Sequence, residues 1–270
     1  MHAAKGIGLA QVREVYSGNE GDLWELLMGQ QIHIGGMRSS QDLAERAGIG
    51  EGQRGVDLCC CSGAGMRFLV RFRKVASMIG VDATAKVVER GRARCREEGL
   101  GDRIELVLAD ACATGLAPDL ADFVWAEDAW CYVEDKPRLV AEAARLVRPG
   151  GTIAFTDWVE GPRGLSASEA EQLMRFMKFP SLESLAGYPR LLESAGCTVI
   201  EASDTGRFGP HIELYLQMAQ MQLGYDVLRI LDWSEPALDA LGGAMTWMLE
   251  LARAGKLVQG RFVARKRPDG

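Results

Sequence analysis

The stretch Val56-Asp57-Leu58-Cys59-Cys60-Cys61-Ser62-Gly63-Ala64-Gly65-Met66-Arg67 predicts a buried strand, a loop of small residues and the start of a helix. Small residues after a strand allow the backbone to approach a ligand closely. In doubly wound sheets, ligands bind beyond the carboxyl ends of the strands. We therefore expect this loop to form one wall of a ligand site.

The chain around this stretch alternates between expected strands and helices. Strands are expected at 55–60, 75–81, 104–108, 122–126 and 152–156, with helices at 66–73, 86–98 and 137–147. Further along, helices are expected at 166–179, 182–195, 211–231 and 236–254, and strands at 197–202 and 257–266. Such alternation predicts a parallel sheet covered on both faces. The fold class expected is α/β, with a Rossmann-like, doubly wound, mostly parallel seven-stranded sheet.

The segments flanking the central alternation define the expected domain organisation. Residues 1–54 are expected to form an N-terminal helical cap, and residues 55–165 the ligand-binding core. Residues 166–270 would complete the core, with a helical lid at about 203–256 inserted before the final strand. No repeat or low-complexity linker separates these parts, so we expect one integrated domain.

Composition narrows the class of protein. The 270 residues carry a net charge of −6 and no run of 18 apolar residues, which argues against nucleic-acid and membrane partners. The seven cysteines are odd in number and include no Cys-x-x-Cys pair, so neither a disulfide framework nor a metal site is expected. Since no secretory signal is evident at the N-terminus, we expect a cytoplasmic protein with reduced thiols.

Acidic residues stand at the ends of successive expected strands. Asp82 ends the second strand, where a carboxylate suits the hydroxyls of a ribose. Asp110 ends the third strand and could accept from an adenine amino group, and Glu127 follows the fourth. The Gly-x-Gly-x-x-Gly loop that holds a pyrophosphate is absent. This order of features predicts an adenosine-containing cofactor other than a dinucleotide.

The motifs resemble those of class I S-adenosylmethionine-dependent methyltransferases. The resemblance lies in Asp57-Leu58 with Ser62-Gly63, Gly80-Val81-Asp82, Ala109-Asp110-Ala111 and Leu146-Val147-Arg148-Pro149-Gly150-Gly151. Outside these motifs, Tyr16-Ser17, Gln31–Gly35 and Arg253–Leu257 are similar to sarcosine/dimethylglycine N-methyltransferases, and more loosely to phosphoethanolamine and sterol-type methyltransferases. The cofactor that this resemblance implies is S-adenosyl-L-methionine.

The resemblance also implies which residues hold the cofactor. They are Tyr16, Ile34, Gly35, Asp57, Cys59, Ser62, Gly63, Asp82, Ala83, Asp110, Ala111 and Glu127. Cys59 and Cys61 stand where the family usually has glycine. Because cysteine favours a negative φ and adds a side chain, we expect a slightly reshaped loop or a shifted cofactor.

Candidates for catalysis and substrate binding are less specific. Tyr132 and His33 are the candidate catalytic residues, and relatives often carry a histidine where this chain has Tyr132. An aromatic lining could hold a methylated ammonium through cation–π attraction, although for any single one of these residues a place in the core is the more common outcome. The candidate substrate-binding residues are Trp24, Trp130, Trp158, Tyr188 and His211.

Three functions follow from these observations. The first is methylation of a small molecule, in particular N-methylation of a small amine such as sarcosine or dimethylglycine. The second is O- or C-methylation of a natural product, for which the nucleophile usually needs a base. The third is a catalytically silent cofactor-binding protein. A homodimer is compatible with all three.

Overall fold

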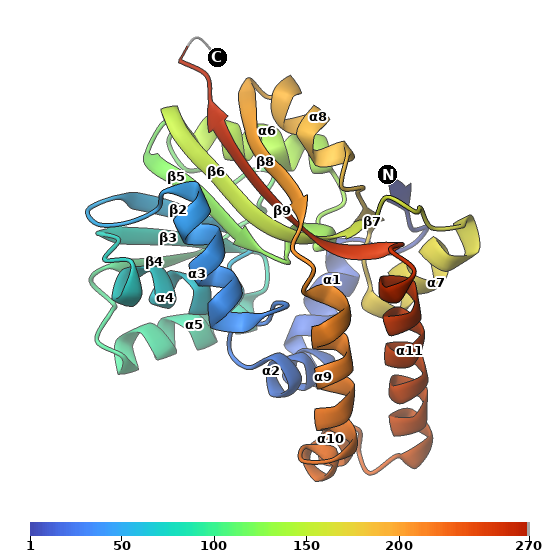
Figure 1. The fold of residues 1–270 in the computed structure, drawn as a ribbon. Helices are drawn as coiled ribbons and strands as arrows, with labels where there is room; N and C mark the ends of the chain where they lie inside the picture. The colour runs from blue at the N-terminus through green and yellow to red at the C-terminus, as the bar shows by residue number, and fades with distance from the viewer. Residues whose placement is uncertain (269–270) are drawn as a thin grey trace.

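The centre of the molecule is a sheet of seven strands, seen in a computed structural model that describes residues 1–268. The strand order is β4-β3-β2-β5-β6-β9-β8 (Figure 1). β9 pairs antiparallel with β6 and β8, and the remaining pairs are parallel. The strands are β2 Arg54–Leu58, β3 Ser77–Asp82, β4 Ile104–Leu108, β5 Ala121–Glu127, β6 Val147–Glu160, β8 Cys197–Asp204 and β9 Leu257–Lys266. The predicted Rossmann-like sheet is confirmed.

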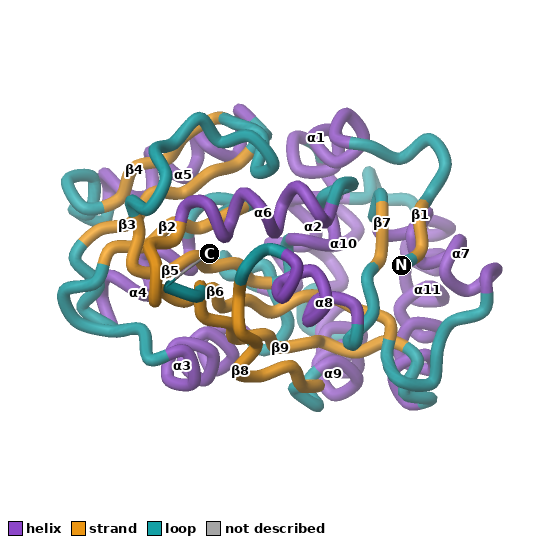
Figure 2. Tube along the Cα trace, turned by 90° about the horizontal axis from the view of Figure 1, so that it is seen from above, coloured by secondary structure: helices purple, strands orange, loops and turns teal. Residues whose placement is uncertain are grey.

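Helices cover both faces of this sheet (Figure 2). They are α3 Gly36–Ala47, α4 Ala64–Phe72 and α5 Ala85–Glu97 on one face, and α6 Lys136–Leu146 and α8 Gly187–Ser194 on the other. Along β5, Phe123 and Trp125 belong to the first core, and Val124 and Ala126 to the second. Burial on both faces explains why these strands are continuously apolar in sequence.

A third core lies between the sheet and a helical extension. The extension consists of α7 Ala167–Met177, α9 Phe208–Gln220, α10 Gly224–Ile230 and α11 Glu235–Arg253. α9 and α11 stand side by side below the sheet in Figure 1. The expected single helix over 211–231 is wrong, because α9 ends at Gln220 and α10 begins at Gly224.

The N-terminal segment contacts the rest of the molecule in two places. The helices α1 Leu9–Ser17 and α2 Asn19–Met28 pack on each other, and α2 also contacts α9 and α10. The short strand β1 His2–Ala3 pairs antiparallel with β7 Ser181–Leu182. This pairing was not expected, and it explains why the helix expected from residue 182 begins only at Gly187.

Shared cores join the N-terminal helices, the sheet and the extension. We propose that the expected segments, 1–54, 55–165 and 166–270, fold as one unit. Within residues 1–268, no helix combines the length and the apolar character that crossing a bilayer requires.

Candidate functional site

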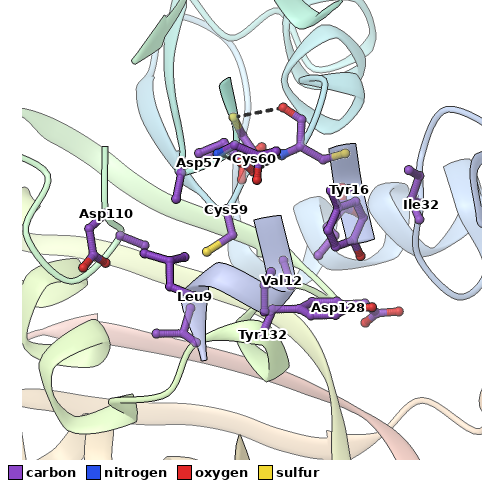
Figure 3. A pocket seen from close by; sticks show the side chains of 18 of the residues that line it. Leu9, Val12, Tyr16, Ile32, Asp57, Cys59, Cys60, Asp110, Asp128 and Tyr132 are labelled. Atoms are coloured by element: carbon purple, nitrogen blue, oxygen red, sulfur yellow. Dashed lines mark hydrogen bonds between the residues drawn. The ribbon is translucent and has the colours of Figure 1, made fainter. Parts of the chain in front are cut away.

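A cavity of about 640 Å³ opens at the carboxyl ends of β2, β3, β4 and β5. Pockets that hold drug-sized ligands typically have volumes of about 300–1,000 Å³. The helix α1 lies over the cavity, and its Leu9, Val12 and Tyr16 face inward (Figure 3). The cavity wall contains the predicted residues Tyr16, His33, Asp57, Cys59, Asp82, Ala83, Asp110, Ala111, Glu127 and Tyr132. Segments far apart in sequence thus meet where the strand-end pattern predicts.

The loop after β2 holds two cysteines in the left-handed backbone region. Cys59 has a φ of 66° and Cys61 a φ of 49°, whereas Cys60 does not have a positive φ. The expectation that cysteine would impose a negative φ is therefore wrong at both positions. The loop is held by backbone hydrogen bonds: the N–H of Cys59 donates to Val81 O at 2.8 Å, and that of Cys61 to Asp82 Oδ2 at 3.0 Å. The chain thus follows a glycine-type path with two thiols on the cavity wall.

Asp82 and Asp110 are fixed by backbone donors on their own loops. Asp82 Oδ1 accepts from the N–H of Thr84 at 2.8 Å, in addition to the bond from Cys61. Asp110 Oδ1 accepts from the N–H of Cys112 at 2.8 Å. Because each carboxylate can accept further hydrogen bonds, both can receive ligand hydroxyl or amino groups from the cavity.

Asp57 and Glu127 converge on Gly65 at the floor of the cavity. A Cβ atom at Gly65 would lie 2.6 Å from Glu127 Oε2 and 3.7 Å from Asp57 Oδ2. Only a glycine leaves this space open. Burial, followed by the charges of Glu127 and Asp82, raises the pKa of Asp57 well above its usual range.

Two arginines form hydrogen bonds with the loop after β2, a contribution that the sequence did not reveal. Arg67 Nη1 donates to Ser62 O at 2.6 Å and Nη2 to Gln30 Oε1 at 2.7 Å. Arg94 Nη1 donates to Ser62 Oγ at 2.9 Å. Ser62 and Gly63, predicted to bind the cofactor, therefore lie outside the cavity wall and position the loop.

Asp128 is a further candidate site residue, to which the sequence assigned no role. Its backbone has a φ of 50°, and its carboxylate lies beside Tyr132 on the cavity wall. Asp128 Oδ2 accepts from the N–H of Ile34 at 2.7 Å, and Gln259 Nε2 donates to both carboxylate oxygens. Ile34 and Gly35 are thus held next to the cavity without lining it.

An inner pocket of about 10 Å³ continues from the cavity. It is walled by Tyr16, Trp24, Met28, Ile32, Asp128, Tyr132, Trp158, Met177 and Phe179. The predicted substrate residues Trp24 and Trp158 lie here. Tyr16 and Phe179 each contact the Tyr132 ring edge to face, with centroids 5.2 and 4.9 Å away. Since this volume holds about one water, the pocket must widen to admit a ligand, and flexible methionines in its wall allow that.

Of the two candidate catalytic residues, His33 has polar partners at both ring nitrogens, and Tyr132 is a buried phenol. His33 Nε2 lies 3.2 Å from Ser40 Oγ and 3.3 Å from Glu127 Oε1, while Nδ1 lies 3.3 Å from Ile34 O. Both ring nitrogens therefore have partners. Burial raises the pKa of Tyr132 well above its usual value, and likewise that of Tyr16, so both phenols stay protonated at neutral pH.

Three predicted substrate residues lie away from both cavities. Trp130 stacks on Phe155 within the sheet core, with centroids 3.9 Å apart. Tyr188 is also buried in that core and donates to Asp157 Oδ2 at 2.6 Å. His211 lies on α9, where its Nδ1 is 2.9 Å from Arg207 O. Their positions do not support the expected contacts with a substrate. The spacing of aromatic residues in a sequence does not show whether a side chain lies in the core or in a pocket.

The lid expected at about 203–256, closing together with the N-terminal segment, stays a prediction. No residue of 203–256 lines the cavity or the inner pocket within the described chain. α1 covers the cavity instead, and Arg13 Nε donates to Ala83 O at 2.9 Å, which holds the helix over the strand ends. The extension packs behind α2, in the third core.

These residues fit an adenosine-containing cation such as S-adenosylmethionine. The cavity has a suitable volume, a glycine-type loop and carboxylates along its length. Asp82 and Asp110 can hold hydroxyl and amino groups, while Asp57 and Glu127 offer negative charge to a cationic end.

Comparison with known proteins relates the central part of the chain to one family. Residues 56–155 match the family described as a methyltransferase domain. Over 173 residues, the chain is 32% identical to methyltransferase GfsG of Streptomyces halstedii, covering 63% of this chain and 61% of that protein. The chain spans about half the length of the plant phosphoethanolamine N-methyltransferases that it also matches.

Solved structures share the fold. One described as a sarcosine dimethylglycine methyltransferase from Galdieria sulphuraria has a TM-score of 0.78, 23% identity and 86% coverage of each chain. Phosphoethanolamine N-methyltransferase 2 of Haemonchus contortus, with phosphomonomethylethanolamine and S-adenosylhomocysteine, has a TM-score of 0.83 and 21% identity, covering 94% of this chain and 58% of its own. The match over residues 56–155 supports the predicted methyltransferase domain, and these structures show that the class I methyltransferase fold is shared.

Proposed function

From the premise that the chain carries a class I methyltransferase domain, we propose that it methylates a small amine with S-adenosylmethionine. The observation that carries the amine is the inner pocket, whose aromatic walls surround a single carboxylate, Asp128. When bound, the cofactor supplies a methyl group activated by its sulfonium charge. Sarcosine and dimethylglycine are the acceptors to be tested first.

Charge in the inner pocket suits an amine. Asp128 can attract the acceptor as its ammonium ion, because its own position is fixed by Ile34 and Gln259. The ammonium must lose its proton to water before the pocket closes, so the deprotonated amine is the species whose nitrogen attacks the methyl group. The faces of Trp24 and Trp158 can stabilise the positive charge that grows on a methylated nitrogen. The walls also exclude water from the reacting atoms.

Within residues 1–268, no side chain of the inner pocket is a free base, and this also supports an amine as the acceptor. Its titratable groups are Tyr16, Tyr132 and Asp128, of which the phenols stay protonated and the carboxylate is hydrogen-bonded. A deprotonated amine needs no base at the chemical step. Tyr132 and Tyr16 then serve as neutral donors and as packing surfaces.

Methylation of an oxygen or carbon in a natural product is the second candidate. It is favoured by the apolar walls contributed by Met28, Met177 and Phe179. Such an acceptor would have to gain a base, and His33 is the nearest imidazole on the cavity wall. A silent cofactor-binding protein is the third possibility, for which the strained cysteines of the loop are the argument.

An acceptor screen tests these candidates. The protein is incubated with S-adenosylmethionine carrying a deuterated methyl group and with sarcosine, dimethylglycine, phosphoethanolamine, an aliphatic alcohol or a phenol. Mass spectrometry then follows the labelled product and S-adenosylhomocysteine. We expect label on an amine nitrogen. Label only on oxygen or carbon would overturn the amine, and cofactor binding without any transfer would favour the silent protein.

A further inference from the structure

Asp57 differs in its surroundings from the other acids at the strand ends, Asp82, Asp110, Glu127 and Asp128. Its side chain is 4% exposed and lies on the cavity wall, yet no donor within residues 1–268 forms a hydrogen bond or ion pair with it. The carboxylates of the four other strand-end acids all have donors: Ser40 for Glu127, backbone N–H groups for Asp82 and Asp110, and Ile34 with Gln259 for Asp128. A buried charge without a partner is costly, so Asp57 must either stay neutral or receive a cation.

The groups that face Asp57 make its ionised form still less favourable. Glu127 and Asp82 are the charged neighbours, and both raise its pKa in addition to burial. The thiols of Cys59 and Cys60 also lie close, and their own pKa values are raised by burial first and by the charges of Asp57 and Asp82 after it. No lysine or arginine among the described residues balances this group.

We propose that Asp57 holds a proton in the ligand-free protein and releases it when a cationic cofactor binds in the cavity. A nearby positive charge favours the carboxylate, so ligand charge and proton release are coupled. The inference rests on the proposed function, because that assigns the cofactor. It adds a linkage: affinity for the cation rises with pH as Asp57 loses its proton, and then becomes constant.

Calorimetric titration with S-adenosylmethionine at one pH, in phosphate and in Tris, measures this proton directly. The two buffers have different ionisation enthalpies, so a released proton makes the observed binding enthalpy differ between them. We expect that difference for the wild-type protein and its loss in Asp57→Asn. Glu134→Gln, which changes an exposed acid at the cavity mouth, is the matched control and should keep the difference.

Two results would overturn the linkage. One is a wild-type binding enthalpy that is equal in both buffers, and the other is a release in Asp57→Asn as large as in the wild type. If Asp57→Asn fails to fold, Glu127→Gln replaces it: removing the neighbouring charge lowers the pKa of Asp57, so fewer protons are released at the same pH. An unchanged release in that variant also overturns the linkage. Wild-type protein that binds no cofactor would instead overturn the proposed function, and the linkage with it.

Discussion

Asp128 Oδ2 accepts a hydrogen bond of 2.7 Å from the backbone N–H of Ile34. This bond joins the end of β5 to the N-terminal segment. Gln259, on β9, closes the network by donating to Asp128 and to Ile34 O at 3.0 Å. A carboxylate fixed in this way needs little reorganisation when a charge develops beside it, which makes it a suitable anchor for the acceptor.

Asp128→Asn should therefore weaken acceptor binding more than cofactor binding. The amide cannot balance an ammonium, and a loss of about 1.4 kcal/mol corresponds to about a tenfold rise in the acceptor KM. Steady-state kinetics with the amine identified by the screen, together with calorimetry for the cofactor, measure both quantities. Asp82→Asn is the contrasting variant and should mainly raise the cofactor Kd. Equal losses for both ligands in Asp128→Asn would contradict the assignment.

The cysteine loop offers a comparison within three consecutive residues. A residue other than glycine in the left-handed backbone region destabilises the folded protein by about 1–2 kcal/mol. Glycine removes this cost, but its larger loss of backbone entropy on folding cancels about 0.5–1 kcal/mol of the benefit. Cys59→Gly and Cys61→Gly should each raise the free energy of unfolding by about 0.5–1 kcal/mol. Cys60→Gly should lower it, because Cys60 is buried and lacks the positive φ. Urea unfolding measures all three, and a Cys59→Gly variant as unstable as Cys60→Gly would refute the strain.

Gly65→Ala should block the cavity floor. The added Cβ would lie 2.6 Å from Glu127 Oε2 and 3.2 Å from Trp125 Nε1, so the carboxyl must move. We expect the cofactor Kd to rise at least about tenfold, equivalent to about 1.4 kcal/mol. Gly50→Ala is the control, since its Cβ would have only Arg73 O nearby, at 4.0 Å. Equal cofactor affinity in the two variants would show that Gly65 is not close to the ligand.

Asp157 predicts a pH dependence of stability. Burial raises its pKa from 3.8 to about 6, while its oxygens accept from Cys131 N–H and Tyr188. The stability that the neutral form contributes is complete below pH 3.8 and is lost as the pH rises through about 6. The asparagine in Asp157→Asn stays neutral at every pH. The free energy of unfolding of this variant, relative to the wild type, should therefore rise by up to about 3 kcal/mol between pH 4 and pH 7. Urea unfolding at these pH values measures the change, and a difference independent of pH would contradict it.

The fold, and which strand-end acids line the cavity, could be predicted because the relevant signals are local. Strand ends, small-residue loops and acids at successive strand ends are all visible in one dimension. Since parallel strands place their carboxyl ends along one edge, Asp82, Asp110 and Glu127 had to meet. The last strand, Leu257–Lys266, also coincides with its expected bounds, because β-branched and apolar residues run between clear breaks.

What could not be predicted depends on tertiary contacts. The left-handed backbone of Cys59 and Cys61 is held by Val81 and Asp82, which lie on another strand. Asp128 lies on the cavity wall with a positive φ and with its carboxylate held by Ile34 and Gln259, none of which is visible in the sequence. For Trp130 and Tyr188, sequence distinguishes neither core from pocket nor one sheet face from the other.

The proposed function requires that the cavity at the strand ends binds S-adenosylmethionine. Titration of the purified protein with the cofactor, followed by calorimetry at pH 7.5, tests it most directly. The structure predicts saturable binding to a single site with a Kd below about 1 mM, weakened by Gly65→Ala and unchanged by Gly50→Ala. No binding at millimolar cofactor, with the wild-type protein folded, would contradict the proposed function.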